Sequence, residues 1–241
     1  MGSAETPADA TIEVRVMSTL PILYSFRRCP YAMRARLALL VSNIHCELRE
    51  VKLSNKPVEM LAAPTSGTVP LLVLSNEQVI DESLDIAIWA LQQNDPYGWL
   101  EDIQLSLALI QENDTSFKHW LDRYKYHVGY PEQTQEWYRE KASEYLLALE
   151  NRLTNHAYLV GDTPRLADAM IFPFIRQFSS VDSDWWASSP YNDLRDWLAK
   201  WCGCSEFALL MKKLTPWVSG TAGVIYPFRD ADLGKDLAVS K

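Results

Sequence analysis

Residues 21–32 read PILYSFRRCPYA, and this stretch decides the fold of the first part of the chain. Its first half, 21–26, is apolar and aromatic and has the length of a buried strand. Pro30 fits the first position of a helix, because that position needs no backbone N–H. Apolar residues then recur at spacings of three and four, at Met33, Leu37, Leu40, Val41 and Ile44. The stretch therefore predicts a strand followed directly by a helix of about three turns.

The predicted helix is amphipathic, because Arg34 and Arg36 fall outside its apolar positions. Residues 47–53 form a second strand candidate, which completes a β-α-β unit. Such a unit implies a parallel strand pair with a right-handed crossover.

The rest of the first domain continues as β-β-α. A weak helical stretch is expected over 56–63, strands over 69–74 and 78–80, and a helix over 82–91. We therefore expect an α/β domain over 21–93, preceded by a flexible leader at 1–20.

Residues 94–100 contain Asp95, Pro96 and Gly98 and are the best candidate for a linker. The sequence beyond them has helical periodicity throughout, which predicts an all-α domain over 101–241. The expected helical stretches cover 101–128, 131–153, 167–178, 192–201 and 207–217.

Composition and charge exclude several classes of protein. The 241 residues are 48% hydrophobic, and 31 acidic against 23 basic side chains give a net charge of −8. An acidic surface repels phosphate backbones, which argues against a nucleic-acid partner. No apolar run is long enough for a transmembrane helix, so no membrane partner is expected. The four cysteines are too few for a disulfide scaffold, which favours a reducing cytoplasm.

Cys29 stands directly before Pro30, at the expected N-terminus of the first helix. Unpaired backbone N–H groups and the helix dipole stabilise a thiolate there, and the thiolate is the nucleophilic form of cysteine. The alternative is a small residue that only packs at a helix end. Ala32 stands where a thioredoxin-type motif has its second cysteine, so the chemistry of Cys29 would end in a mixed disulfide with another thiol. Glutathione is the abundant cytosolic candidate.

Five motifs occur in an order that is typical of one family. They are Cys29-Pro30-Tyr31-Ala32, Asn55-Lys56-Pro57, Thr68-Val69-Pro70, Glu82-Ser83 and Leu166-Ala167-Asp168. With them, residues 21–217 resemble the cytosolic glutathione S-transferases, and most of all the cysteine-type, omega-like enzymes and related bacterial members. The resemblance implies a thioredoxin-like N-terminal domain (βαβ-ββα), an all-α helical-bundle domain and a homodimer.

The resemblance also implies a glutathione site. It predicts a cis peptide before Pro70, and it predicts that the backbone of Val69 pairs with the cysteinyl part of glutathione. Ser83 would bind the γ-glutamyl carboxylate and Glu82 the ammonium, while Lys56 would contact a carbonyl or carboxylate. Taken alone, Glu82-Ser83 also fits an ordinary N-cap and Lys56 a solvated surface lysine.

The same resemblance makes Asp168 a buried folding residue. Family members often have Ser or Thr three residues earlier, where this chain has Arg165. Thr163-Pro164 would then cap the helix instead.

The acceptor pocket is expected on the first long helix of the second domain. In this fold that helix faces the nucleophile, which makes its aromatic residues candidates. Together with Tyr31 they are Phe117, Trp120, Tyr124 and Tyr126. The alternative is that this aromatic stripe packs the bundle or a dimer contact.

Cys202-Gly203-Cys204 has no matching ligand pair elsewhere, so no metal is expected. Tyr24 and Ser25 carry hydroxyl groups and shortly precede Cys29 in the sequence, and other transferase classes activate glutathione with a Tyr or Ser hydroxyl.

Three functions remain open. The first is a glutathione-dependent thiol transferase or dehydroascorbate-type reductase, in which Cys29 forms a mixed disulfide with glutathione while a small molecule or protein thiol is the acceptor. The second is conjugation of glutathione to an electrophile. The third is non-catalytic: a glutathione-binding or scaffolding module, or a protein that resembles the intracellular chloride-channel family.

Overall fold

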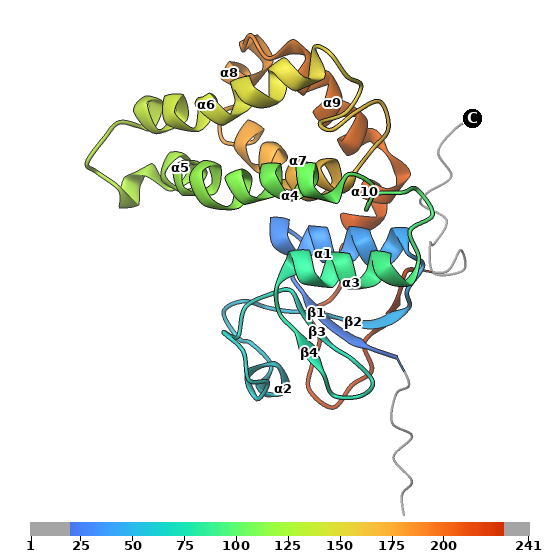
Figure 1. Ribbon diagram of the computed structural model, residues 1–241. Coiled ribbons are helices and arrows are strands. Elements are labelled where there is room, and N and C mark those ends of the chain that lie inside the picture. The colour runs from blue at the N-terminus through green and yellow to red at the C-terminus, as the bar shows by residue number, and fades with distance from the viewer. Residues whose placement is uncertain (1–19, 229–241) are drawn as a thin grey trace, which may run out of the picture.

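The computed structural model describes residues 20–228. It contains one mixed five-stranded sheet, which lies in the first domain (Figure 1). Its strands are β1 (Ile22–Ser25), β2 (Cys46–Glu50), β3 (Leu71–Val73), β4 (Val79–Ile80) and β5 (Val224–Tyr226), in the order β4-β3-β1-β2-β5. β1 and β2 are parallel, and β3 and β4 follow as antiparallel neighbours. The predicted β-α-β and β-β-α order is confirmed. The predicted leader lies outside the described residues, except for Leu20.

Helices cover both faces of this sheet unequally. The helices of the first domain are α1 (Pro30–Val41), α2 (Val58–Leu61) and α3 (Ser83–Gln93). α1 and α3 pack against one another and form a layer between the sheet and the helical domain (Figure 1). Met60 of α2 packs on the other face, in a small cluster with Tyr24 and Leu71.

The second domain is a helical bundle. Its helices are α4 (Ile103–Glu112), the π-helical turn η1 (Asn113–Phe117), α5 (Lys118–Lys125), the 3-10 turn η2 (His127–Gly129), α6 (Gln135–Leu153), α7 (Leu166–Ser179), α8 (Ser183–Ser188), α9 (Asn192–Gly203) and α10 (Ser205–Leu210). The single stretch predicted over 101–128 is thus interrupted by η1, and α8 was not predicted.

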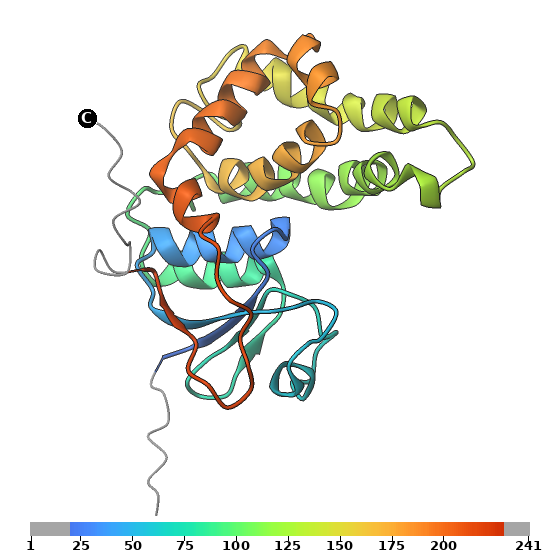
Figure 2. The same ribbon diagram turned by 180° about the vertical axis from the view of Figure 1, so that it is seen from behind.

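The prediction of a helix over 207–217 is wrong beyond Leu210. The chain leaves the bundle there and returns to the sheet, where β5 pairs antiparallel with β2 (Figure 2). The backbone N–H of Trp217 donates to the carbonyl of Glu50 at 2.8 Å, and the hydroxyl of Tyr226 donates to the carbonyl of Arg36 at 2.9 Å. Over residues 211–217 the apolar side chains are at most partly buried, and Trp217 packs on the cluster that contains Tyr24 and Leu71. Residues 101–241 are therefore not all helical.

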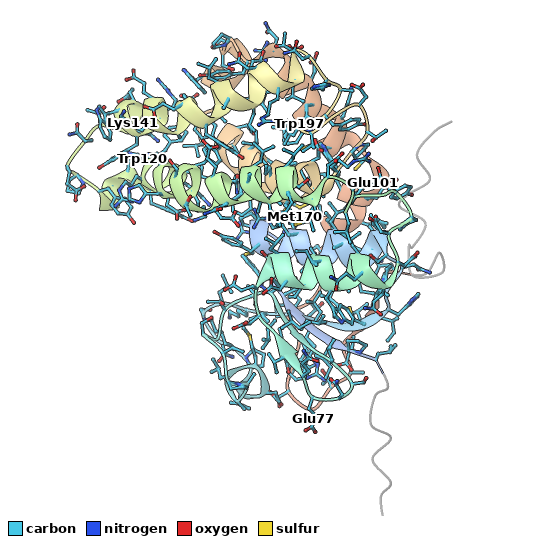
Figure 3. All side chains as sticks on the ribbon, viewed as in Figure 1. Glu77, Glu101, Trp120, Lys141, Met170 and Trp197 are labelled. Atoms are coloured by element: carbon cyan, nitrogen blue, oxygen red, sulfur yellow. The ribbon has the colours of Figure 1, made fainter. Side chains whose placement is uncertain are left out.

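α1 is not amphipathic, because it is buried on every side. Arg34 and Arg36, expected outside the apolar stripe, are 0% and 2% exposed. The Nε of Arg34 donates to the carbonyl of Met170 at 2.7 Å, and its two Nη atoms donate to the carboxylate of Asp114 at 2.8 and 2.6 Å. Figure 3 shows Met170 at the boundary between the two domains. A helix that lies between two domains has no solvent face, so its cations need internal partners.

The π turn η1 contains the partner of Arg34. Asp114 lies in η1 and also accepts a hydrogen bond from the side-chain amide of Asn113 at 2.8 Å. π turns insert an extra residue into a helix and change the direction of the side chains that follow. Here the turn occurs where the helix faces α1 and supplies the carboxylate for its buried guanidinium.

Asp168 is fully buried in the first turn of α7, as the resemblance implied. Its carboxylate accepts hydrogen bonds from the backbone N–H groups of Leu159 at 2.9 Å and Arg165 at 3.0 Å, and from the indole of Trp197 at 2.8 Å. Arg165 is the N-cap, so the expected cap at Thr163-Pro164 is wrong. Burial raises the pKa of Asp168 to about 6, although its three hydrogen bonds favour the charged form.

We predict that the contribution of Asp168 to stability is lost as pH rises through about 6. The folded state binds the proton more tightly than the unfolded chain, so this contribution is fully present only below the unfolded pKa of about 3.9. The free energy of unfolding of the wild type, minus that of Asp168→Asn, should fall by roughly 2 kcal/mol between about pH 4 and pH 7. Denaturant titrations across this range measure it, and a constant difference would contradict it.

We also predict that Asp114→Ala lowers the free energy of unfolding by about 2 kcal/mol or more, because it leaves the buried Arg34 guanidinium without its counter-charge. Glu144→Ala is the matched control, since it breaks the exposed Lys141–Glu144 pair and should cost less than about 1 kcal/mol. Urea denaturation of both variants compares them. Equal losses of stability in the two variants would show that the Arg34–Asp114 pair contributes no more than an exposed pair.

Candidate functional site

Strand register brings the predicted site residues to one edge of the sheet. Tyr24 of β1 pairs with Leu71 of β3, and Leu72 pairs with Ile80 of β4. The end of β1, the start of β3 and the end of β4 therefore lie side by side. Cys29 follows the first of these points, Val69 precedes the second, and Glu82 and Ser83 follow the third. Residues far apart in the sequence thus converge on one edge.

Cys29 is the N-cap of α1 and is partly exposed. The loop before it is closed by the N–H of Cys29, which donates to the carbonyl of Phe26 at 3.1 Å. The carbonyl of Cys29 in turn accepts the N–H of Met33 at 2.9 Å, which closes the first helical turn. The sulfur therefore lies at the end of a helix whose first N–H groups and dipole stabilise negative charge.

The Val69 carbonyl lies across the site from this sulfur. The thiol of Cys29 donates to the carbonyl of Val69, with the two heavy atoms 3.7 Å apart. The peptide between Val69 and Pro70 is cis, as the resemblance implied. The backbone of Val69 thus faces the nucleophile rather than a neighbouring strand.

The start of α3 forms the adjoining part of this edge. Glu82 is its exposed N-cap and Ser83, 3% exposed, is its first residue. This gives a second helix N-terminus at the edge, beside that of α1. Two such termini favour anionic groups in the space between them.

Lys56 joins the loops beside this edge. Its ammonium donates to the carbonyl of Gly67 at 2.8 Å, which connects the loop after β2 to the loop before β3. Gly67 has φ +67°, and an added Cβ would lie 3.2 Å from the side chain of Leu61. Lys56 therefore has a structural partner in the chain, and its predicted contact with a ligand stays a prediction.

A cavity of about 480 Å³ opens beside Cys29, between α1 and α5. Its lining contains aromatic rings and charged side chains from both domains, namely Phe26, Arg28, Cys29, Pro30, Tyr31, Leu53, Lys118, Asp122, Lys125, Tyr126 and Gln177. Burial raises the pKa of Tyr31 to about 12, so its hydroxyl stays protonated at neutral pH. The cavity has the size of a small-molecule site.

The structure separates the aromatic candidates for the acceptor pocket. Tyr31 and Tyr126 line the cavity. Phe117 and Tyr124 are 0% and 1% exposed and pack on Phe178 inside the bundle, so they do not line it.

Trp120 also belongs to the bundle. Its ring lies 5.5 Å from that of Trp137 of α6, and Figure 3 shows it between α5 and α6. The alternative interpretation of this stripe, as bundle packing, is thus the correct one for Phe117, Trp120 and Tyr124. On α5 the polar side chains face the cavity, because the aromatic ones are buried against α6 and α7.

Most of the lining residues were not predicted as site residues, among them Leu53, Lys118, Asp122, Lys125 and Gln177. Gln177 comes from α7, which is otherwise buried over 166–175. The signal was present in the sequence, since Arg176-Gln177 interrupts that apolar run.

The other three cysteines lie in different environments. Burial raises the pKa of Cys46 to about 12 and raises those of Cys202 and Cys204, so these thiols stay protonated at neutral pH. Within residues 20–228, no group of three or more His, Cys, Asp or Glu side chains is placed to hold a metal ion. No helix of the same range is both long and apolar enough to span a bilayer.

Comparison with known proteins identifies the family. The model described as "Glutathione S-transferase, N-terminal domain" matches residues 23–97, and that described as "Glutathione S-transferase, C-terminal domain" matches residues 102–203. Over 178 residues the chain is 27% identical to the probable glutathione S-transferase parA of Nicotiana tabacum, covering 67% of this chain and 74% of the relative. Over 62 residues it is 40% identical to glutathione S-transferase omega-2 of Rattus norvegicus, 26% and 25% of the two chains.

Solved structures agree on the fold. A glutathione transferase of Phanerochaete chrysosporium in complex with oxidized glutathione superposes with a TM-score of 0.69 at 16% identity, covering 80% of this chain and 95% of that one. A family member from Pseudomonas fluorescens with two glutathione bound gives 0.66 at 17% identity, covering 80% and 92%. Similarity at this identity establishes the thioredoxin-like and helical two-domain fold.

Proposed function

This chain belongs to the glutathione S-transferase family, and on that premise we propose that it is a glutathione-dependent thiol transferase that works through Cys29. The observation that carries the proposal is the position of the sulfur. Cys29 is partly exposed at the N-terminus of α1, lines a cavity of about 480 Å³ and lies 3.7 Å from the carbonyl of Val69. A cysteine in that position is accessible, lies at a helix N-terminus and is next to a backbone carbonyl that could pair with a peptide.

In the proposal, glutathione binds along the edge formed by β1, β3 and α3. The backbone of Val69 pairs with its cysteinyl residue, as an added strand would. The N-terminus of α3 with Ser83 receives the γ-glutamyl carboxylate, and Glu82 pairs with the ammonium. Lys56 contacts a carbonyl or carboxylate from the neighbouring loop. These assignments match the charge that each position presents.

The exchange takes place in two steps. The Cys29 thiolate attacks the glutathione sulfur of a mixed disulfide between glutathione and an acceptor thiol. A bond forms between the two sulfurs, the original disulfide breaks, and the acceptor leaves as its thiolate. A second glutathione thiolate then attacks the glutathione sulfur on Cys29, which releases oxidised glutathione and restores the Cys29 thiolate.

The contact with Val69 helps to couple binding to reactivity. In the free protein the thiol of Cys29 donates to the Val69 carbonyl. An N–H of bound glutathione would take this acceptor, since a carbonyl pairs more strongly with N–H than with S–H. The thiol would then lose its hydrogen-bond partner while remaining at the N-terminus of α1. Substrate binding would thus prepare the nucleophile.

The two hydroxyl groups weighed for a conjugating enzyme are occupied elsewhere. Tyr24 lies on the face of the sheet opposite α1, and its hydroxyl accepts a hydrogen bond from Arg49 at 2.8 Å. Ser25 is fully buried, and its hydroxyl accepts a hydrogen bond from the guanidinium of Arg36. Neither residue lines the cavity. This favours Cys29 over a hydroxyl as the reacting group.

The proposed cycle needs a compartment that keeps glutathione reduced, so we place the protein in the cytoplasm. The homodimer implied by the family resemblance stays a prediction, which sedimentation equilibrium can test.

We predict that Cys29→Ser reduces turnover of a glutathione mixed disulfide by roughly a hundredfold or more, because it removes the nucleophile of a two-step exchange. Cys204→Ser is the matched control and should keep wild-type turnover. Intact-protein mass spectrometry after treatment with oxidised glutathione should show one glutathione on wild type and control, and none on Cys29→Ser.

Other outcomes would select the alternatives. Unchanged turnover in Cys29→Ser would contradict the mechanism. Conjugation to an electrophile that survives in Cys29→Ser, with no disulfide turnover in either protein, would indicate a conjugating enzyme. Glutathione binding without any turnover would indicate a binding module.

We further predict that Glu82→Gln weakens glutathione binding by about tenfold, because the neutral amide keeps the shape but loses the charge opposite the ammonium. The effect should appear in KM for glutathione with kcat little changed. Asp85→Asn is the control, since it removes a carboxylate one turn further along α3. If both substitutions change KM equally, only the general charge of α3 matters.

A further inference from the structure

A second cavity adjoins the one beside Cys29. It has a volume of about 370 Å³, and Arg28, Lys125 and Gln177 line both cavities. The rest of its wall comes from the bundle, at Gln135, Pro173, Arg176, Ser180 and Val181. The space next to the reactive sulfur therefore extends toward α6 and α7.

The walls of these two cavities are basic, although the protein is acidic. Four of the lining residues are cations, namely Arg28, Lys118, Lys125 and Arg176. Among the described lining residues, Asp122 alone is acidic. Over the whole chain, acidic residues outnumber basic ones by 31 to 23. Positive charge is thus concentrated around the two cavities beside Cys29.

Three of these cations have no acidic partner in the described part of the chain. Lys118 forms an ion pair with Asp122, but no ion pair within residues 20–228 involves Arg28, Lys125 or Arg176. Each of these three instead lies over an aromatic ring, at 5.6, 4.8 and 5.2 Å from the ring centres of Phe26, Tyr126 and Phe207. Such contacts orient the side chain and leave its N–H donors available to a ligand.

We propose that the acceptor joined to glutathione is a small thiol that carries carboxylates, bound by Arg28, Lys125 and Arg176. This inference rests on the proposed function, because it names the substrate class of the same site. Guanidinium groups bind carboxylates through two parallel hydrogen bonds, and an ammonium adds a point charge. The positive walls also attract an anion toward an otherwise negative molecule.

The cations of the walls argue for this class over a wholly apolar acceptor, although Phe26, Tyr31 and Tyr126 also line the first cavity. A pocket for an apolar electrophile would be lined mainly by apolar and aromatic side chains. Here the aromatic candidates Phe117, Trp120 and Tyr124 are directed into the bundle, while charged residues of the same segment line the cavity.

Two unreactive thioethers of glutathione test the inference without turnover. In S-(1,2-dicarboxyethyl)glutathione, the four-carbon group attached to the sulfur carries two carboxylates. In S-butylglutathione, the attached group also has four carbons but carries no charge. Calorimetric titration of the full chain should show that the dicarboxylate binds about tenfold or more tightly at low ionic strength. In about 1 M salt, where the Debye length is ~3 Å, most of this preference should disappear.

Variants assign the preference to the named residues. In Arg28→Gln/Lys125→Gln/Arg176→Gln the ratio of the two affinities should fall close to one, and Arg176→Gln alone should lower it in part. Lys141→Gln is the matched control, because Lys141 is a cation on α6 (Figure 3) that pairs with Glu144 and lines neither cavity. It should keep the wild-type ratio.

The outcomes separate this inference from the proposed function. Equal binding of the two thioethers to wild type, or an unchanged ratio in the triple variant, would overturn the carboxylate site while leaving Cys29 chemistry intact. If the wild type bound neither thioether and did not bind glutathione itself, both the carboxylate site and the proposed function would be overturned. If the wild type showed no disulfide turnover but still bound the dicarboxylate thioether more tightly, only the proposed function would be overturned.

Discussion

The ion pair between the buried Arg34 and the partly exposed Asp114 is the interaction on which the rest of the structure depends. It joins α1 of the first domain to the π turn η1 of the second, and the same guanidinium also holds the Met170 carbonyl of α7. Removing such a cation from water is costly, so the two domains are stable together only in the arrangement that supplies these acceptors. That arrangement also places the start of α5 beside Cys29.

α1 serves both domains because its two arginines point in different directions. Residues two apart lie on different faces of a helix. Arg34 faces the bundle, whereas Arg36 donates to the carbonyls of Phe26 and Arg27 at 3.3 and 2.8 Å and to that of Leu210 at 3.4 Å. Arg36 therefore holds the loop that leads to Cys29 and the end of α10 at once. The reactive sulfur gains its position from one helix that is anchored at two points.

Electrostatics then divides the site into two parts. On the sheet edge, the N-termini of α1 and α3 provide partial positive charge and Glu82 a negative charge, which matches a zwitterionic peptide. On the bundle side, Arg28, Lys125 and Arg176 provide full positive charges around the cavities. A negative chain thus carries a localised basic site, which the net charge of −8 alone does not reveal.

Local patterns in the sequence determined the strand-helix order, the place of Cys29 at a helix start and the helical second half, because these depend on neighbouring residues. Only the tertiary structure decided that Arg34 and Arg36 are buried, that β5 returns to the sheet and that Phe117 and Tyr124 turn into the bundle. Periodicity assumes that a helix has one solvent face, and α1 has none. Strand pairing between β2 and β5 joins residues from opposite ends of the chain, and no local pattern contains that contact.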